Sequence, residues 1–131
     1  MNILKRNSSP RYKRDSITSH LLVSALTCGA ENLTITLVEM EPGGFQHVHY
    51  HRPEQMYYIL EGSGVMTVDD KRREVQAGDC IYYPSMAKHG LENTGGTVLR
   101  YLSAASPSFT EEQCRKAWPL PSEDDENRKG A

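Results

Sequence analysis

Short stretches in which apolar and polar residues alternate recur along the chain, separated by turns that contain glycine. Residues 33–40 read Leu-Thr-Ile-Thr-Leu-Val-Glu-Met, an alternation typical of a strand. Further short runs rich in apolar or β-branched residues lie at 20–23, 56–60, 65–68, 80–83 and 98–102, and residues 72–75 are expected to return from the Asp69-Asp70 turn as the partner strand of 65–68. Strands at this spacing favour an antiparallel sandwich or barrel over an α/β fold.

The pattern changes near residue 106. Thr110 and Gln113 fit a capping box, so a short helix is predicted from there to Trp118, and Pro119 ends it. The chain has 131 residues, enough for one hydrophobic core and too few for two. We therefore expect one domain, organised as a polar N-terminal arm (1–16), a β-barrel (17–105), a C-terminal helical segment (106–118) and a charged tail (119–131).

Composition narrows the possible partners and location. The formal net charge is −2 and 37% of the residues are hydrophobic, with no apolar run near the ~20 residues of a membrane span. We therefore expect neither nucleic acid nor a membrane as a partner. The first residues lack the apolar stretch of a secretory signal, which predicts a cytoplasmic protein. Three widely spaced cysteines do not form a disulfide framework.

Histidines provide the candidate chemistry. His49 and His51 are two residues apart, and on an extended strand such residues point to the same face. Both imidazoles can then reach one divalent metal, for which imidazole is a suitable ligand. Gln55 has the same parity as His51, and His89 follows a strand whose end Pro84 marks. Three imidazoles and one amide oxygen are therefore a candidate metal site.

These residues closely resemble the two sequence motifs of the cupin superfamily. The first motif, G-x5-H-x-H-x3-4-E-x6-G, corresponds to Gly43, His49, His51, Gln55 and Gly62. The second, G-x5-P-x-G-x2-H-x3-N, corresponds to Gly78, Pro84, His89 and Asn93. The resemblance covers most of residues 33–102. It implies a small single-domain cupin: an all-β, double-stranded β-helix or jelly-roll barrel, here followed by a short C-terminal helix and often dimeric.

The resemblance also implies that the metal ligands are His49, His51, His89 and Gln55. Gln55 stands where the family usually has glutamate, and Met86 stands where the second motif has glycine. Because three imidazoles and an amide are all neutral, a bound iron, manganese, nickel or zinc ion would keep its full charge. It would attract an anionic substrate and act as a Lewis acid.

We therefore expect an isomerase, lyase or cyclase that acts on a small acidic or carbonyl compound, in a homodimer. The alternatives are a non-haem metal-dependent dioxygenase and a non-catalytic cupin that binds a small molecule. The same open metal positions serve oxygen and substrate in an oxygenase, and fold alone does not decide among the three.

Three residues close to the ligands in sequence are candidates for proton transfer: Tyr57, Glu54 and His47. Alternation places Tyr57 on the same face as Gln55. His47 shares the parity of His49, so it is either an additional ligand or a neighbour of one. Glu54 would replace Gln55 as a ligand if the loop shifted by one residue, although the glycine spacing favours Gln55.

Overall fold

A computed structural model describes residues 1–117; Trp118 and the expected charged tail at 119–131 lie outside the described residues. None of the described helices is long and apolar enough to cross a membrane. The elements in chain order are η1 (Arg6–Ser8), β1 (Arg11–Arg14), β2 (Ile17–Val23), α1 (Ala25–Cys28), β3 (Thr34–Met40), β4 (Phe45–His49), β5 (Glu54–Glu61), β6 (Ser63–Val68), β7 (Lys71–Gln76), β8 (Cys80–Tyr83), β9 (His89–Glu92), β10 (Leu99–Ser106) and α2 (Glu111–Ala117).

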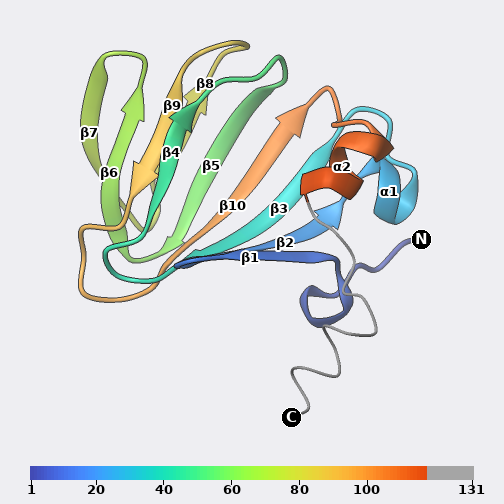
Figure 1. The fold of residues 1–131 in the computed structure, drawn as a ribbon, viewed down its shortest axis with the longest axis horizontal. Helices are drawn as coiled ribbons and strands as arrows, with labels where there is room; N and C mark the ends of the chain where they lie inside the picture. Colours follow the sequence, from blue (N-terminus) through green and yellow to red (C-terminus); the bar gives the residue numbers. More distant parts are fainter. Residues whose placement is uncertain (118–131) are drawn as a thin grey trace.

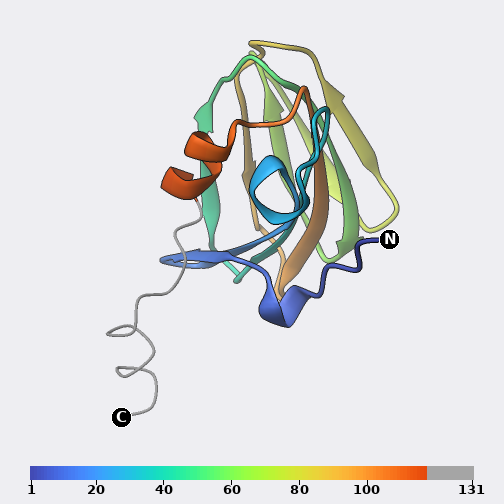
Figure 2. The same ribbon diagram turned by 90° about the vertical axis from the view of Figure 1, so that its right-hand side faces the viewer.

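Two antiparallel sheets face each other and form the barrel (Figure 1). The larger sheet has the order β1-β2-β3-β10-β5-β8, and the smaller one β4-β9-β6-β7. Helices α1 and α2 pack together at one end (Figure 2). The expected all-β barrel with a short C-terminal helix is confirmed.

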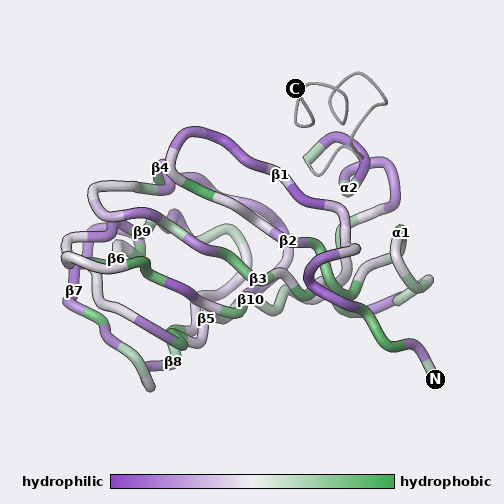
Figure 3. Tube along the Cα trace, turned by 90° about the horizontal axis from the view of Figure 1, so that it is seen from below, coloured by the Kyte–Doolittle hydropathy of each residue, from purple (hydrophilic) through white to green (hydrophobic). Residues whose placement is uncertain are grey.

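The core lies between the sheets because every second residue of a strand faces inward. On β10, Leu99, Tyr101, Ser103 and Ala105 are all buried, and the residues between them are only partly buried. Figure 3 shows hydrophobic and hydrophilic residues following one another along the strands of both sheets. Each large apolar side chain buried here contributes about 1.5–3 kcal/mol to folding.

The structure adds elements that the apolar pattern did not predict. Residues 11–14, part of the expected polar arm, form β1, which pairs only with β2 at the edge of the larger sheet. An edge strand of this kind needs no apolar alternation, and charged residues are common there. The short helix α1 was also unexpected; Ser24 caps it, accepting a hydrogen bond from the Thr27 backbone N–H at 3.0 Å.

A charged cluster joins three strands of the larger sheet on its outer face. Glu39 of β3 accepts hydrogen bonds from Arg100 of β10 and His20 of β2, each at 2.9 Å, and from Arg6. Burial alone would raise the pKa of Glu39, but these donors outweigh burial and lower the pKa to about 2. The carboxylate therefore stays charged and ties η1 and β2 to the barrel.

Asn93, a residue of the second motif, is buried and structural. Its side-chain amide donates to the carbonyls of Met40 and Thr97, each at 2.9 Å. Its backbone N–H donates to Gly44 O, and its carbonyl accepts from the N–H of Gly43. The side chain thereby fixes the turn that leads from β3 into β4, the strand that carries His49.

Candidate metal centre

Strand pairing brings two distant histidines together. His49, at the end of β4, is paired directly with His89, at the start of β9. His51 lies two residues past the end of β4, in a loop and not on the extended strand that the sequence suggested. Its ring nevertheless turns to the others, with ring centroids 4.7 Å from His89 and 5.7 Å from His49. One ring nitrogen from each of the three lies within 4.8 Å of the others.

Backbone carbonyls fix the orientation of all three rings. Nδ1 of His49 lies 2.8 Å from His47 O, Nδ1 of His51 lies 2.9 Å from Pro53 O, and Nδ1 of His89 lies 2.9 Å from Ala87 O. A carbonyl oxygen can only accept, so Nδ1 carries the proton and donates in each case. The neutral imidazoles are therefore in the tautomer that leaves Nε2 with a free lone pair, as metal-binding histidines require.

The free nitrogens converge. Nε2 of His49 lies 3.1 Å from Nε2 of His89, so two lone pairs face each other and need a cation between them. Burial, together with the neighbouring imidazoles of His49 and His51, lowers the pKa of His89 to about 4, so the His89 ring is neutral at neutral pH. Burial also lowers the pKa of His51. The donor set fits a divalent metal ion.

Gln55 of β5 lies beside this group of histidines. Its Nε2 donates to Oγ of Ser103, a buried residue of β10, so the amide nitrogen is already used. Its Oε1 is buried and has no hydrogen-bond partner among residues 1–117. Burial lowers the pKa of the His51 imidazole, and the Gln55 amide beside this ring opposes the shift only in part. A buried amide oxygen with no hydrogen-bond partner, next to the histidines, is expected if this oxygen serves as a fourth metal ligand.

A β-bulge in β4 decides which of its residues face inward. Gln46 pairs with Leu91 and His49 with His89, so β4 contains one residue more than β9 between these pairs. The extra residue breaks the period of two, and the parity argument that aligned His47 with His49 does not apply. Gln46 accepts hydrogen bonds from the hydroxyls of two buried tyrosines, while the His47 side chain is exposed.

Gly90 makes room for this bulge. A Cβ atom at Gly90 would lie 2.9 Å from Gln46 O and 3.0 Å from Val48 Cγ2. The backbone of β4 can therefore approach β9 this closely only where the facing residue has no side chain. Gly90 thus helps to place the His49 ring.

Met86 links the two motif loops despite replacing a glycine. Its backbone has φ 68, in the left-handed region that non-glycine residues seldom adopt. Its N–H donates to His51 O at 2.9 Å. The left-handed conformation at this position therefore holds the His51 loop against the loop before His89, and methionine adopts it at a cost of about 1 kcal/mol.

Aromatic rings surround the imidazoles. Tyr83 stacks on His89 with centroids 3.9 Å apart, and Phe109 contacts the edge of His51 at 5.5 Å. Tyr57 is fully buried; its hydroxyl donates to Gln46 Oε1 at 3.0 Å, as does that of Tyr101 at 3.2 Å. Burial raises the pKa of Tyr57, so this hydroxyl stays protonated.

The structure separates the residues expected to carry protons. Tyr57 faces inward, next to the three histidines, with its ring centroid 6.5 Å from that of His89. His47 lies on the wall of a cavity that reaches His49. Glu54 points to the outer face of β5, where Tyr82 donates to it at 3.4 Å, because its neighbour Gln55 faces inward. Glu54 therefore does not join the cluster.

Sequence reasoning missed three residues of this centre: Ser103, Gln46 and Phe109. Ser103 was detectable in part, because its small polar side chain sits among apolar residues in a strand that reads as buried. Gln46 required knowledge of the bulge. Phe109 comes from the segment before α2, 58 residues after His51, and no local pattern links the two.

Two facing antiparallel sheets around a cluster of three histidines define a small β-barrel with a candidate metal site. Residues 36–105 match the cupin domain family, so the chain belongs to the cupins. It is 37% identical over 101 residues to an uncharacterised protein of Methanocaldococcus jannaschii, covering 76% of this chain and 80% of that one.

Two further relatives have named activities. A dimethylsulfoniopropionate lyase of Ruegeria pomeroyi is 33% identical over 107 residues, covering 81% of this chain and 68% of the lyase. The solved structure of a polyketide cyclase from Streptomyces resistomycificus superposes with a TM-score of 0.69 at 25% identity, covering all of this chain and 94% of the cyclase.

Substituting Gly90 tests the link between the bulge and the ligands. We expect Gly90→Ala to lower the free energy of unfolding by about 1–3 kcal/mol, because the added Cβ pushes the β4 backbone away. Urea unfolding measures this loss. Gly96→Ala is the matched control, since a Cβ there meets nothing within 4 Å, and it should change stability by less than about 0.5 kcal/mol. Equal stabilities of the two variants would contradict the packing described for Gly90.

Proposed function

We propose that this cupin is a metal-dependent enzyme in which His49, His51, His89 and Gln55 hold one divalent transition metal: iron, manganese, nickel or zinc. The proposal rests on one observation about the three imidazole rings. The Nδ1 atom of each ring donates a hydrogen bond to a backbone carbonyl, and the unprotonated Nε2 atoms on the other side of the rings converge. Imidazole ligands whose second nitrogen is held in this way are typical of metal sites.

The bound metal would supply Lewis-acid chemistry, polarising a carbonyl or enolate oxygen of a small anionic substrate. The neutral donor set supports this choice over a carboxylate-containing site, because no ligand offsets the metal charge. The lyase and cyclase activities of the two named relatives support the same class of reaction. Dimethylsulfoniopropionate is a zwitterion, and its carboxylate supports a substrate that presents carboxylate oxygens to the site.

Two of the three candidate residues, His47 and Tyr57, lie where they could take part in the reaction. His47 lies on the wall of the cavity that reaches His49, where it can contact a bound molecule. Tyr57 holds Gln46, which lines the same cavity, through the hydroxyl hydrogen bond. We assign proton transfer to His47 and a positioning role to Tyr57, and none to Glu54.

Metal titration tests the ligand assignment. The protein should bind one equivalent of zinc or manganese, and at a free concentration 100 times Kd the metal should stabilise the fold by about 2.7 kcal/mol. We expect His51→Ala to lose this stabilisation while remaining folded, because it removes one of three imidazoles. His47→Ala is the control and should bind metal as the wild type does. Calorimetric titration and thermal unfolding report both quantities. Stoichiometric metal on His51→Ala would overturn the assignment.

Deuterium exchange tests the chemistry. A Lewis acid on a carbonyl oxygen makes the neighbouring C–H acidic, so the zinc-loaded protein should speed exchange of that proton in small 2-oxo acids in D2O without oxygen. NMR follows the exchange, and His51→Ala is expected to abolish it. Oxygen uptake by the iron-loaded protein, with no anaerobic exchange, would support the dioxygenase alternative instead. If the protein binds a small molecule but catalyses neither proton exchange nor oxygen uptake, the result would support the non-catalytic binding alternative.

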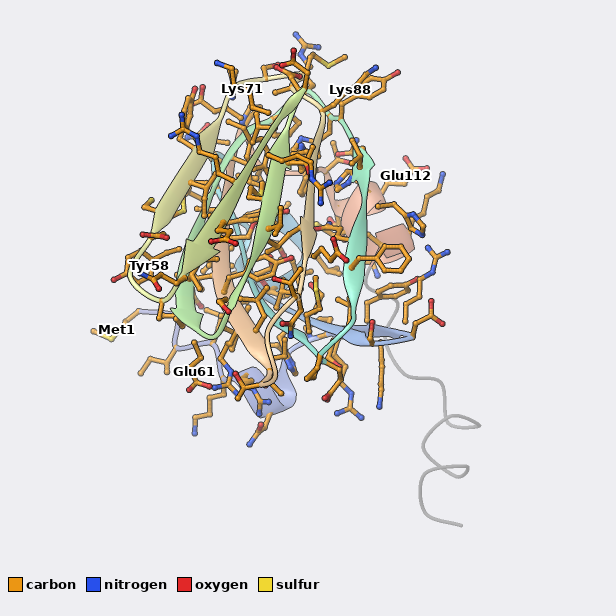
Figure 4. The ribbon with its side chains drawn as sticks, turned by 90° about the vertical axis from the view of Figure 1, so that its left-hand side faces the viewer. Met1, Tyr58, Glu61, Lys71, Lys88 and Glu112 are labelled. Carbon is orange, nitrogen blue, oxygen red and sulfur yellow. The ribbon has the colours of Figure 1, made fainter. Side chains whose placement is uncertain are left out.

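We also propose that the protein is a homodimer formed through the outer face of the larger sheet. Strand register places a row of apolar side chains on this face, across β3, β10, β5 and β8: Leu37, Leu102, Met56, Tyr58 and Tyr82. Tyr58 and Tyr82 are exposed to 40% and 60%, and Figure 4 shows Tyr58 pointing away from the barrel. Adjacent exposed apolar side chains of this kind mark association surfaces.

The dimer can be tested by placing charge on this face. Tyr58→Glu should give a monomer, because it would bury an unpaired charge in the apolar interface. Glu74→Gln, on the exposed strand β7, is the control and should leave the mass unchanged. Light scattering coupled to size-exclusion chromatography measures the mass. A wild-type monomer at micromolar concentration would contradict the proposal.

A cytoplasmic location completes the proposal. The three cysteines at positions 28, 80 and 114 are all free. Unpaired thiols, one of them exposed, suit a reducing compartment.

A further inference from the structure

A cavity of about 370 Å³ opens between the smaller sheet and the β1–β2 hairpin. His49 lies on its wall, so the cavity reaches the candidate metal centre. The volume is in the range of small-molecule sites. In Figure 2, β4 and β1 lie on the same side of the barrel, which is where the sheets do not close on each other.

The alternation along β1 decides which of its residues face this cavity. Tyr12 pairs with Ser19 and Arg14 with Ile17, and Ser19 and Ile17 pair in turn with the inward-facing Val38 and Met40 of β3. Tyr12 and Arg14 therefore face inward, and both line the cavity. Lys13, between them, faces the opposite side.

The tip of the hairpin is held in place. Ser16 O accepts a hydrogen bond from the N–H of Glu41 at 2.9 Å. Gly44 packs so closely on Ser16 that a Cβ there would lie 2.5 Å from Ser16 Oγ. These contacts connect the β1–β2 turn to the β3–β4 turn. The position of Arg14 relative to the start of β4 is therefore fixed by the fold.

Arg14 has unused hydrogen-bonding capacity. Its Nε lies 4.0 Å from the carboxylate of Asp15, and both side chains are exposed, so this ion pair is weak. Among residues 1–117, no acceptor pairs with its terminal guanidinium nitrogens. Guanidinium groups bind carboxylates through two parallel hydrogen bonds. Arg14 is also the only arginine or lysine among the described residues that line the cavity.

The candidate metal centre lies at one end of the cavity and Arg14 at the other, and both can bind an oxygen-bearing group. His49 marks one end and Phe45, at the other end of the bulged strand β4, lies at most about 13 Å away along the strand. The apolar side chains of Tyr12, Ile17 and Val38 line the wall, together with the polar residues Asp15, Ser16, Ser19 and His47. Gln46 and Tyr101 add polar groups. Such a wall suits a short carbon chain that carries an oxygen group at each end.

We propose that the substrate is a two-ended organic anion, whose carboxylate distal to the metal binds Arg14. The assignment rests on the proposed function for its metal end. Arg14 and Tyr12 make β1 the part of the chain that selects among substrates: the histidines accept any oxygen-bearing group, and Arg14 requires a second carboxylate at a fixed distance. A monocarboxylate would leave the guanidinium without a partner.

Calorimetric titration of the zinc-loaded protein with dicarboxylates from succinate to suberate tests this assignment. The mono-methyl ester of each acid is the matched ligand, because it has the same length and one charge fewer. We expect one chain length at which the wild type binds the diacid at least about tenfold more tightly than its half-ester. Arg14→Gln should remove this preference. Lys13→Gln removes the same charge from the outward face of the same strand and should keep it.

The outcomes separate the two proposals. A wild type with no preference for a diacid, or equal behaviour of Arg14→Gln and Lys13→Gln, overturns the assignment of Arg14. Zinc stoichiometry is measured on the same samples: normal zinc binding in Arg14→Gln leaves the metal site intact. A wild type that binds no zinc contradicts the proposed function and the inference that rests on it.

Discussion

Three hydrogen bonds from imidazole Nδ1 to backbone carbonyls are the interactions on which the rest of the site depends. Each bond fixes a tautomer and a ring orientation, so that the nitrogens opposite meet as lone pairs. In the absence of a cation this arrangement is electrostatically unfavourable. Burial also disfavours protonation of His89, which would otherwise relieve the repulsion. The rest of the fold must therefore offset the electrostatic repulsion within the cluster of three histidines.

Several local features support this cluster, and each acts through the backbone. The bulge in β4 turns both Gln46 and His49 inward, and Gly90 allows the two strands to come close enough for it. Met86 ties the His51 loop to the loop before His89. Ser103 takes up the amide nitrogen of Gln55 and leaves the oxygen free. The aromatic rings of Tyr83 and Phe109 then cover the imidazoles from two sides.

Sequence reasoning succeeded where a short-range rule applies. Period-two alternation located most strands, and motif spacing brought His49, His51 and His89 together, because strand pairing and spacing are linked in this barrel. It failed where geometry depends on the partner strand. Because of the bulge, His47 does not face the same side of β4 as His49. Because Gln55 faces inward, its neighbour Glu54 lies on the outer face of β5. The polar strand β1 lacks the alternation of apolar and polar residues that predicts a strand. The inward orientation of Tyr12 and Arg14 therefore could not be predicted from the sequence.

The central claim is that three imidazoles and one amide oxygen hold a single divalent metal. X-ray absorption at the zinc edge of the zinc-loaded protein tests it most directly. We expect only nitrogen and oxygen neighbours of the zinc at about 2.0–2.2 Å, with the outer-shell scattering of three imidazole rings. Scattering from fewer than three imidazoles, or a sulfur neighbour at about 2.3 Å, would contradict it.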